Sequence, residues 1–334
     1  MQAWQVVRPA PIDEQPLEFI QLTDPEPGPG QVRIRVLASG VCRTDLHLAE
    51  GDLPPRRPRT IPGHEIVGVV DATGPGSHRF QNGDRVGVAW LASTCGACRF
   101  CRRGQENLCP DAQFTGWDRD GGYAELVVAD ERYIYRLPDG LSDEQAAPLL
   151  CAGIIGYRAL KAAHVPPGGR LGMFGFGASA HLTAQLAVAL GTEVYVSTRS
   201  AEARALADSL GAVWVGRPED RPPHPLDGVI LFAPAGTLVP QCLEALDSGG
   251  TVVIAGIHLS DLPPLTYREH LFGERSVRSV TANTRTDGEE LLRLVPRLGV
   301  VATTTPYPLH EADAALRDLA HDRVVGAAVL RVSG

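Results

Sequence analysis

The sequence predicts an α/β protein of two domains, a β-rich domain followed by a doubly wound parallel sheet. The chain has 334 residues, which is too long for one ordinary core and suits two domains of about 150 residues each. As far as about residue 137, short alternating or β-branched runs are separated by Gly and Pro, which is typical of an antiparallel, partly closed sheet. After residue 140, strand-like and helix-like patterns alternate, and this indicates a parallel sheet covered by helices.

The β-rich domain is expected to span residues 1–147. Its clearest strands are predicted at residues 32–36, 65–70, 85–88 and 124–128, where β-branched residues recur between turn residues. Few helical stretches interrupt them. Side chains on the connecting loops would therefore be held by a stiff scaffold.

The second domain is expected to span residues 148–280. A capping box at 142–145 precedes an apolar helical pattern over 149–163, with Cys151 near its beginning. Strands are then predicted at 170–176, 193–197, 213–215, 228–232 and 251–255, and helices at 178–190, 201–210 and 238–246. The tail, 281–334, is expected to return to the first domain with helices at 288–298 and 311–319, turns at its prolines and a strand at 324–332.

Charge and composition exclude several classes of partner. A net charge of -8 argues against nucleic acid or an anionic membrane surface, since both require clustered Lys and Arg. No apolar run reaches about 18 residues, and the N-terminus lacks the pattern of a signal peptide. We therefore expect a cytoplasmic protein. Its seven cysteines suit metal binding in a reducing compartment better than a disulfide framework.

Four of the cysteines, Cys95, Cys98, Cys101 and Cys109, form the motif C-x2-C-x2-C-x7-C. Four thiolates this close in sequence can converge on one tetrahedral ion, so we predict a closed, structural zinc site in a lobe at residues 93–111. The alternative is an iron–sulfur cluster, because Cys109-Pro110 resembles the end of the bacterial ferredoxin run. That run has three residues before its last Cys, and this one has seven.

A second set of candidate ligands begins with Cys42 and continues with His64 and Glu65. A thiolate, an imidazole and a carboxylate are ligand types of zinc, and Cys151 offers a further thiolate. A hydroxyl and another imidazole accompany Cys42, at Thr44 and His47. Three protein ligands with an open position distinguish catalytic zinc from structural zinc.

The first strand-to-helix turn of the second domain carries a dinucleotide pattern. Gly175-Phe176-Gly177-Ala178-Ser179-Ala180 follows an apolar strand and opens a helix, which is the context that a pyrophosphate needs. At the end of the second strand, a carboxylate would normally bind the ribose 2'-hydroxyl. This sequence has Thr198 and Arg199 there instead, which favours NADP(H) slightly over NAD(H).

Taken together, these stretches resemble the zinc-dependent alcohol dehydrogenases of the medium-chain dehydrogenase/reductase superfamily, over essentially the whole chain. The motifs that carry the resemblance are residues 41–47, 62–65, the four-cysteine lobe, 150–153 and the turn at Gly175. The resemblance implies a GroES-like catalytic domain, a Rossmann cofactor domain and a homotetramer or homodimer. It also implies reversible hydride transfer between NAD(P) and a primary or small secondary alcohol, its aldehyde or ketone.

Roles of individual residues follow from the same resemblance. It makes Cys42, His64 and Cys151 the catalytic zinc ligands and Glu65 an alternate ligand. Asp45 would fix His64 through its other ring nitrogen. Thr44 and His47 would carry the alcohol proton to water. The cofactor would contact Arg43, Thr44, His47, Ile155, Gly175, Gly177, Ala178, Ser179, Thr198 and Arg199, and the substrate would contact Thr44, Leu53, Trp90 and Trp117. Ile155 is a departure, because many relatives have Thr at this position.

Three other readings share parts of this pattern. A zinc-free quinone or enoyl reductase of the same superfamily would have the fold but no need of all three catalytic ligands. A zinc-stabilised binding protein without turnover would not need Thr44 and His47. A polyol or formaldehyde-type dehydrogenase would share the metal site and differ in its pocket and loops. The apolar residues Leu53, Trp90 and Trp117 favour primary alcohols or aldehydes, either aliphatic or aromatic.

Overall fold

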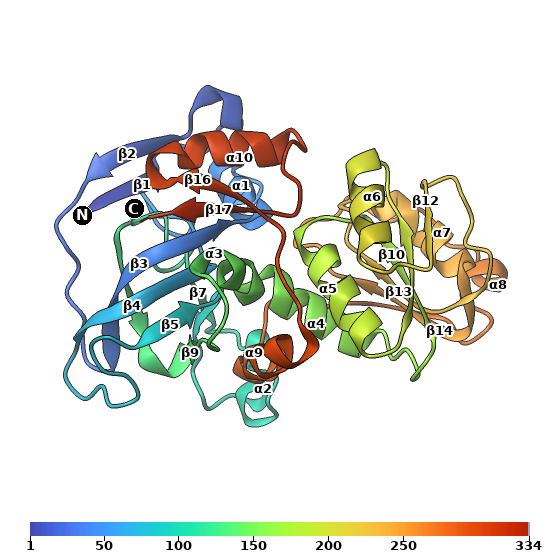
Figure 1. Ribbon diagram of the computed structural model, residues 1–334, viewed down its shortest axis with the longest axis horizontal. Coiled ribbons are helices and arrows are strands. Elements are labelled where there is room, and N and C mark those ends of the chain that lie inside the picture. Colours follow the sequence, from blue (N-terminus) through green and yellow to red (C-terminus); the bar gives the residue numbers. More distant parts are fainter. Residues whose placement is uncertain (333–334) are drawn as a thin grey trace. The chain divides into compact units, whose positions relative to one another are not determined.

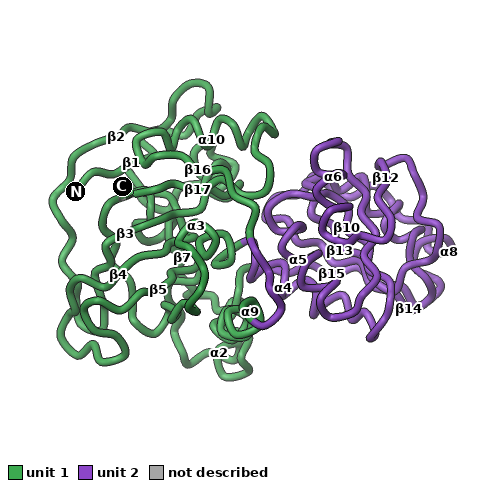
Figure 2. The backbone as a smooth tube through the Cα atoms, viewed as in Figure 1, with its two compact units in different colours: residues 1–151, 282–296, 302–334 green, residues 152–281, 297–301 purple. Residues whose placement is uncertain are grey.

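The computed structural model describes residues 1–332, which fold into two compact units (Figure 2). Unit 1 contains residues 1–151, 282–296 and the chain from 302 onward. Unit 2 contains residues 152–281 and 297–301. The expected return of the tail to the first domain is thus interrupted by a short segment that belongs to unit 2.

Unit 1 is built on a seven-stranded sheet (Figure 1). Its strand order is β16-β17-β3-β4-β5-β9, and β8 pairs with β3 beside this path. The strands are β3 (Gln31–Val41), β4 (Ile66–Thr73), β5 (Arg85–Val88), β8 (Leu126–Asp130), β9 (Ile134–Arg136), β16 (Thr304–Pro308) and β17 (Ala327–Arg331). All pairs are antiparallel except β16 with β17. Val32, Ile34 and Val36 alternate along β3 and are fully buried, so this face of the sheet forms the core.

Smaller elements surround this sheet. The hairpin of β1 (Gln2–Val6) and β2 (Leu17–Gln21) shares an apolar cluster with α1 (Arg43–Glu50) and α10 (Ala312–Ala320). Strands β6 (Leu91–Ser93) and β7 (Gln113–Phe114) flank a lobe that contains α2 (Arg99–Arg102). The helix α3 (Asp143–Ala146) begins at the predicted capping box, where the Ser142 hydroxyl accepts from the N–H of Gln145.

Unit 2 is a six-stranded parallel sheet with the order β12-β11-β10-β13-β14-β15. The strands are β10 (Arg170–Phe174), β11 (Glu193–Ser197), β12 (Trp214–Gly216), β13 (Leu226–Leu231), β14 (Leu246–Ile254) and β15 (Ser276–Ser279). The helices are α4 (Ala152–Ala162), α5 (Ala178–Ala189), α6 (Ala201–Ser209), α7 (Val239–Glu244) and α8 (Tyr267–His270). The order reverses between β10 and β13, so the prediction of a doubly wound sheet is confirmed.

The structure differs from the predicted elements at several places. The segment after Cys42 is a helix, α1, for which the sequence analysis predicted no element. The predicted helix over 149–163 is divided, because a 3₁₀ turn ends at Leu150 and α4 starts at Ala152. The prolines of β16 lie in an edge strand, where Pro is tolerated because its nitrogen can face outward. The sequence analysis also missed β15.

The helix α9 (Arg285–Leu298) begins three residues before its predicted start. Here the Thr284 N–H donates to the Asp287 carboxylate at 3.0 Å, and the Asp287 N–H donates to the Thr284 hydroxyl at 3.2 Å, which satisfies two of the free donors at the helix start. Within residues 1–332, no helix combines the length and apolarity needed to cross a membrane.

Candidate metal centres and active site

The first candidate site is organised by the N-terminus of α1. Cys42 is the N-cap residue, and its backbone N–H donates to the Asp45 carboxylate at 3.0 Å. This contact satisfies one of the donors that a helix start leaves free. The helix ends at Gly51 in the left-handed conformation (φ 92°), whose N–H donates to the His47 carbonyl at 3.0 Å. Cys42, Thr44, Asp45 and His47 are therefore fixed on one rigid turn.

Four potential ligands converge beside this helix. The ligand atoms of Cys42, His64, Glu65 and Cys151 all lie within 4.8 Å of one another. The Nε2 atom of His64 lies 3.3 Å from Sγ of Cys151. Zinc bonds of about 2.0 Å to nitrogen and 2.3 Å to sulfur would place two such ligands about 3.6 Å apart on a tetrahedral ion. The donor set and its spacing fit a zinc ion.

Asp45 lies behind these ligands and is 2% exposed. Its Oδ1 atom accepts from the Gly63 N–H at 3.0 Å and from Nδ1 of His64 at 3.1 Å. Its Oδ2 atom accepts from the Tyr123 hydroxyl at 3.3 Å. Because the carboxylate holds the proton at Nδ1, Nε2 of His64 faces the thiols as a ligand. Tyr123 was missed, since nothing near it in sequence indicates this contact.

The electrostatics of the group favour a bound cation. The hydrogen bond from the Cys151 thiol, together with His64, holds the pKa of Cys42 well below its usual value despite burial. Donating that bond and being buried raise the pKa of Cys151. Burial, together with Asp45 and Cys42, raises the pKa of the Tyr123 hydroxyl. Burial lowers the pKa of the His64 ring, but Asp45 and Cys42 outweigh it and hold that pKa well above its usual value. The group therefore favours a positive charge at this place, and a divalent cation would supply it in place of the proton.

Glu65 is held among the candidate ligands by close packing against the neighbouring strand. It is buried, and a Cβ atom at Gly40 would lie 1.8 Å from its Oε2 atom. Only glycine at this position of β3 leaves room for the carboxylate. Its place among the candidate ligands therefore depends on the adjacent strand.

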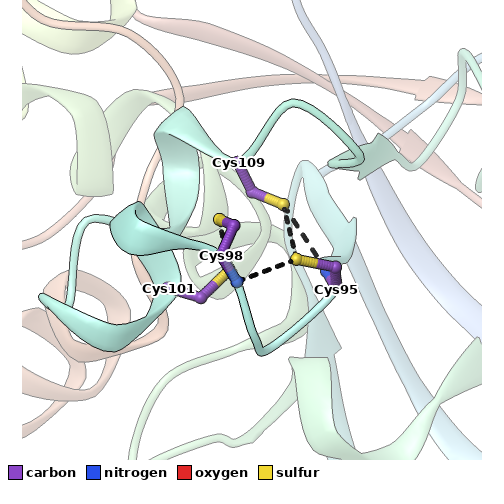
Figure 3. A group of neighbouring side chains, drawn as sticks. All are labelled: Cys95, Cys98, Cys101 and Cys109. Carbon is purple, nitrogen blue, oxygen red and sulfur yellow. Dashed lines mark hydrogen bonds between the residues drawn. The ribbon is translucent and has the colours of Figure 1, made fainter.

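The second candidate centre is the four-cysteine lobe, where all four side chains point toward one another (Figure 3). The Sγ atoms of Cys98 and Cys101 are 3.6 Å apart, and those of Cys95 and Cys109 are 3.5 Å apart. These separations are too long for disulfides, which need about 2.05 Å, and close to the about 3.8 Å of two sulfurs on tetrahedral zinc. The Cys101 N–H lowers the pKa of Cys98 to about 7, which favours the thiolate that zinc binds.

In unit 2, the predicted dinucleotide turn joins β10 to α5. Gly175 has φ 89°, and a Cβ atom there would lie 2.7 Å from the Ala233 nitrogen, so the turn requires glycine. Gly177 is the N-cap of α5, and a Cβ atom there would meet nothing within 4 Å. The turn thus leaves its backbone open at the positive end of a helix, where a pyrophosphate fits. Ala178 and Ser179 form the first turn of α5.

Family models match most of the chain. The model of the alcohol dehydrogenase GroES-like domain matches residues 28–139, and that of the zinc-binding dehydrogenase matches residues 178–297. Probable alcohol dehydrogenase AdhA of Mycobacterium tuberculosis (strain CDC 1551 / Oshkosh) is 55% identical over 99% of this chain and 97% of that protein. The chain belongs to the zinc-dependent alcohol dehydrogenases. It is an oxidoreductase that acts on alcohols, and the fold and family predicted from the sequence are confirmed.

Solved structures agree with this assignment. A CAD from Helicobacter pylori, complexed with NADP(H), has a TM-score of 0.88 and 26% identity, with 99% of each chain covered. The acetophenone reductase of Geotrichum candidum NBRC 4597, in complex with NAD, has a TM-score of 0.89 and 25% identity, with 99% of this chain and 97% of that chain covered. Zinc and a nicotinamide dinucleotide are thus the cofactors of the dehydrogenase, and small-molecule alcohols are its substrates.

The predicted proton relay of the dehydrogenase lies on α1. The Thr44 hydroxyl is 3.6 Å from Sγ of Cys42. Nδ1 of His47 is 3.0 Å from Oδ2 of Asp52, a side chain that is 49% exposed. Asp52 follows the left-handed Gly51, which turns the chain back over the helix end, and the sequence analysis missed it. Arg43, expected to contact the cofactor, pairs here with Asp322.

Aromatic side chains extend outward from His64. The Trp90 ring lies 6.2 Å from the His64 ring and stacks on Phe114, with centroids 4.3 Å apart. The Trp117 ring is 6.3 Å from Trp90 and nearly parallel to it, at 14°. Leu53 follows the end of α1, and its N–H donates to the His47 carbonyl at 3.0 Å. Phe114 was missed, because its place beside Trp90 depends on the pairing of β6 with β7.

The remaining predicted cofactor residues lie in unit 2. Thr198 follows β11 and is buried, whereas Arg199 is exposed. The guanidinium of Arg204, on α6, donates to the carbonyls of both residues at 2.9 and 2.7 Å. Ile155 lies in α4 and packs against the apolar cluster beneath the sheet.

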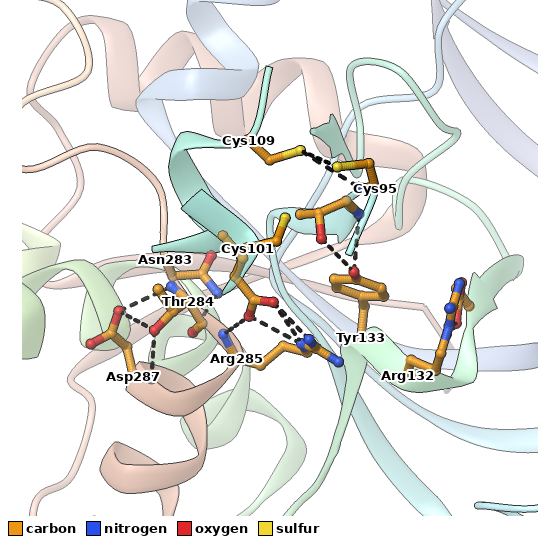
Figure 4. A network of polar contacts seen from close by, with 12 residues as sticks. Cys95, Cys101, Cys109, Arg132, Tyr133, Asn283, Thr284, Arg285 and Asp287 are labelled. Carbon is orange, nitrogen blue, oxygen red and sulfur yellow. Dashed lines mark hydrogen bonds and ion pairs between the residues drawn. The ribbon is translucent and has the colours of Figure 1, made fainter. Parts of the chain in front are cut away.

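A polar network joins the cysteine lobe to the start of α9 (Figure 4). Glu106, between the third and fourth cysteines, accepts from Nε of Arg285 at 3.0 Å and from its Nη2 at 2.7 Å. The Arg285 guanidinium also lies over the Tyr133 ring, 4.7 Å from its centroid. The Tyr133 hydroxyl accepts from the N–H of Thr94, directly before Cys95, at 3.0 Å. The lobe is therefore held by contacts far apart in sequence.

Proposed function

We propose that the dehydrogenase binds two zinc ions per chain and interconverts primary or small secondary alcohols with their aldehydes or ketones. The observation that carries this proposal is the convergence of the buried His64 and Glu65 with the half-buried Cys42 and Cys151, separate from the complete four-cysteine set. Zinc in the first group supplies a Lewis acid for the substrate oxygen, and the nicotinamide gives or takes the hydride. A zinc-free reductase would have no use for this group.

The residues around each proposed zinc ion have different roles in binding it. Cys42, His64 and Cys151 are the proposed ligands, and Glu65 is the alternate ligand where the substrate position is open. Asp45 keeps the proton on Nδ1 of His64, so that Nε2 stays directed at the ion site. The four proposed ligands of the lobe, Cys95, Cys98, Cys101 and Cys109, leave no open position, and their role is structural.

Thr44 and His47 are proposed to move the alcohol proton. They are three residues apart on α1 and so share one face of the helix. The Thr44 hydroxyl accepts a hydrogen bond from the alcohol and passes the proton toward His47. The contact with Asp52 holds a proton on Nδ1 of His47, which leaves Nε2 as the base and stabilises the imidazolium that forms. Asp52 is partly exposed, so the path ends at water.

For the cofactor, we propose binding at the Gly175–Gly177 turn with a preference for NADP(H). The Helicobacter CAD binds NADP(H) and the Geotrichum reductase binds NAD, so the choice has to be argued from this chain's own residues. No carboxylate follows β11 where one would repel a 2'-phosphate, and the exposed Arg199 can donate to that phosphate. A charge-assisted contact of this kind contributes about 1.5 to 3 kcal/mol, or about 10- to 100-fold in affinity.

The test of cofactor choice is kcat/KM for both cofactors in the wild type, Arg199→Ala and Thr198→Asp. We expect Arg199→Ala to lower the NADP(H) value selectively and Thr198→Asp to favour NAD(H). A wild type that prefers NAD(H) tenfold or more, with an NADP(H) value indifferent to Arg199→Ala, would show that Arg199 does not bind the phosphate.

The test of the function itself combines metal analysis with a panel of alcohols. We expect a zinc-to-chain ratio near two, no iron–sulfur absorbance, and a ratio near one with no turnover in Cys42→Ser. A wild-type ratio near one that Cys42→Ser leaves unchanged would refute the catalytic site. A homotetramer or homodimer in the cytoplasm remains our expectation for the assembled enzyme.

A further inference from the structure

Arg56, in unit 1, has no role in the proposed reaction as described so far. Its guanidinium lies over the Trp117 ring, 3.6 Å from the ring centroid. The same group donates from Nη1 to both carboxylate oxygens of Asp118, at 3.0 and 3.1 Å. Arg56 is 45% exposed and Asp118 is 13% exposed, so the acceptor is held more firmly than the donor.

Asp118 is itself fixed by the turn that carries the aromatic residues. Its Oδ2 atom accepts from the N–H of Phe114 at 2.9 Å. The indole N–H of Trp117 donates to the Pro54 carbonyl at 2.9 Å. The contacts of Arg56 and Trp117 therefore connect two segments of the chain, the one that follows Leu53 and residues 114–118.

A second arginine, next to Arg56, makes an ion pair two residues beyond the 114–118 segment without touching an aromatic ring. Arg57 donates to Asp120 at 3.2 Å. None of the cation–π contacts found among the described residues involves Arg57, in contrast to Arg56. Arg57 is thus a matched control for any effect that comes only from holding the segments together.

The position of Trp117 in the aromatic row connects the Arg56 contact to substrate binding. Trp117 is nearly parallel to Trp90, which begins the aromatic row beside the proposed ligand His64. A flat ring on the substrate can gain dispersion and quadrupole contacts from such faces, whereas a two-carbon alcohol is too short to use them. A guanidinium stacked on the indole fixes the ring plane and occupies part of its face.

We propose that Arg56 is a positioning residue that, by fixing Trp117, makes the dehydrogenase favour alcohols that carry an aromatic ring over small aliphatic alcohols. The proposal rests on the proposed function, because it names the substrate class of the same site. Arg56 does not touch the reacting atoms, and it acts through the ring that it covers.

The test compares kcat and KM for benzyl alcohol and ethanol in the wild type, Arg56→Met and Arg57→Met. Methionine keeps the length of the side chain and removes the charge and the planar group. We expect Arg56→Met to lower the ratio of kcat/KM for benzyl alcohol to that for ethanol about fivefold, mainly through KM, which corresponds to about 1 kcal/mol. Arg57→Met should leave the ratio unchanged, and in a Trp117→Leu background Arg56→Met should have no further effect on it.

Acrylamide quenching of tryptophan fluorescence supplies a readout that is independent of turnover. Arg56→Met should increase quenching, and the increase should vanish in the Trp117→Leu background, while Arg57→Met should match the wild type. Equal effects of the two arginine variants, or an Arg56→Met effect on the ratio that persists without Trp117, would overturn the proposal. A wild type that turned over neither alcohol would refute the proposed function and this proposal with it, whereas turnover with an unchanged ratio in Arg56→Met refutes this proposal alone.

Discussion

His181 should make unit 2 sensitive to acid, and the effect can be worked out from its surroundings. The side chain is fully buried in the first turns of α5, and Nδ1 lies 3.4 Å from the Gly177 carbonyl oxygen. Burial lowers the pKa of His181 to about 4, although hydrogen bonds with the backbone of Gly177 and Ala178 partly oppose this effect. The neutral His181 ring thus lies directly after the predicted dinucleotide turn, in the first turns of α5.

The sign of the effect follows from proton binding. The unfolded chain binds a proton at this histidine with a pKa of about 6.5, whereas the folded chain binds it only near pH 4. Between these values the unfolded state holds more protons, so stability is complete above pH 6.5 and falls as the pH falls toward 4. The difference in pKa corresponds to about 3 kcal/mol, of which about 2.5 kcal/mol is lost by pH 4.5.

The perturbation is His181→Asn, which keeps a donor for the Gly177 carbonyl and does not titrate. The free energy of unfolding would be measured in urea at several pH values between 7.5 and 4.5 for both proteins. Acid also protonates the proposed metal ligands of unit 1, but it does so in both proteins, so the difference between them isolates His181. We expect the wild type to lose about 2.5 kcal/mol relative to the variant over this range.

Parallel stability curves would refute this reasoning. A direct check is the titration of the histidine ring by NMR, with the His181 signal assigned by its loss in the variant. A midpoint near 6.5 would show that burial does not govern this side chain.

Three further changes test the metal centres and the relay. Asp45→Asn should weaken zinc binding at the catalytic group about 10- to 100-fold, measured by competition with a chromogenic chelator, and unchanged affinity would contradict the role of Asp45 behind His64. His47→Gln should slow alcohol oxidation about 10- to 1000-fold, mainly at neutral and lower pH and with partial rescue by buffer bases, whereas an equal loss at every pH would exclude the relay. Cys109→Ser should lower the melting temperature and the zinc content before it affects kcat of the remaining folded enzyme, and the reverse order would contradict a structural lobe.

The region around Cys42 shows which features of the candidate site could be predicted from the sequence and which could not. Its ligand types made Cys42, His64, Glu65 and Cys151 candidates, and the family resemblance implied the roles within this set, which the structure brings together. The helix that carries Cys42 was missed, because Cys is not among the usual N-cap residues and the Asp three positions later was read only as a partner of His64. The C-terminal Gly51 was an available signal for this helix.

Contacts between distant segments could not be predicted in the same way. Phe114 stacks on Trp90, and Tyr123 reaches Asp45, only because the β-rich sheet folds these segments together. Local patterns carry no information on such pairing. By contrast, the capping of α9 by Thr284 and Asp287 was visible as a T-x-x-D pattern, so its predicted start could have been placed correctly.

The contact between Arg285 and Glu106 limits how the enzyme can be shortened. The four-cysteine lobe resembles a removable insertion, because β6 and β7 on either side of it pair with each other. Excising residues 95–109 would nevertheless remove the carboxylate that Arg285 binds and leave that cation over Tyr133 without its acceptor. A lobe-free enzyme would therefore need Arg285 replaced by an uncharged residue in the same step, so the two segments must be redesigned together.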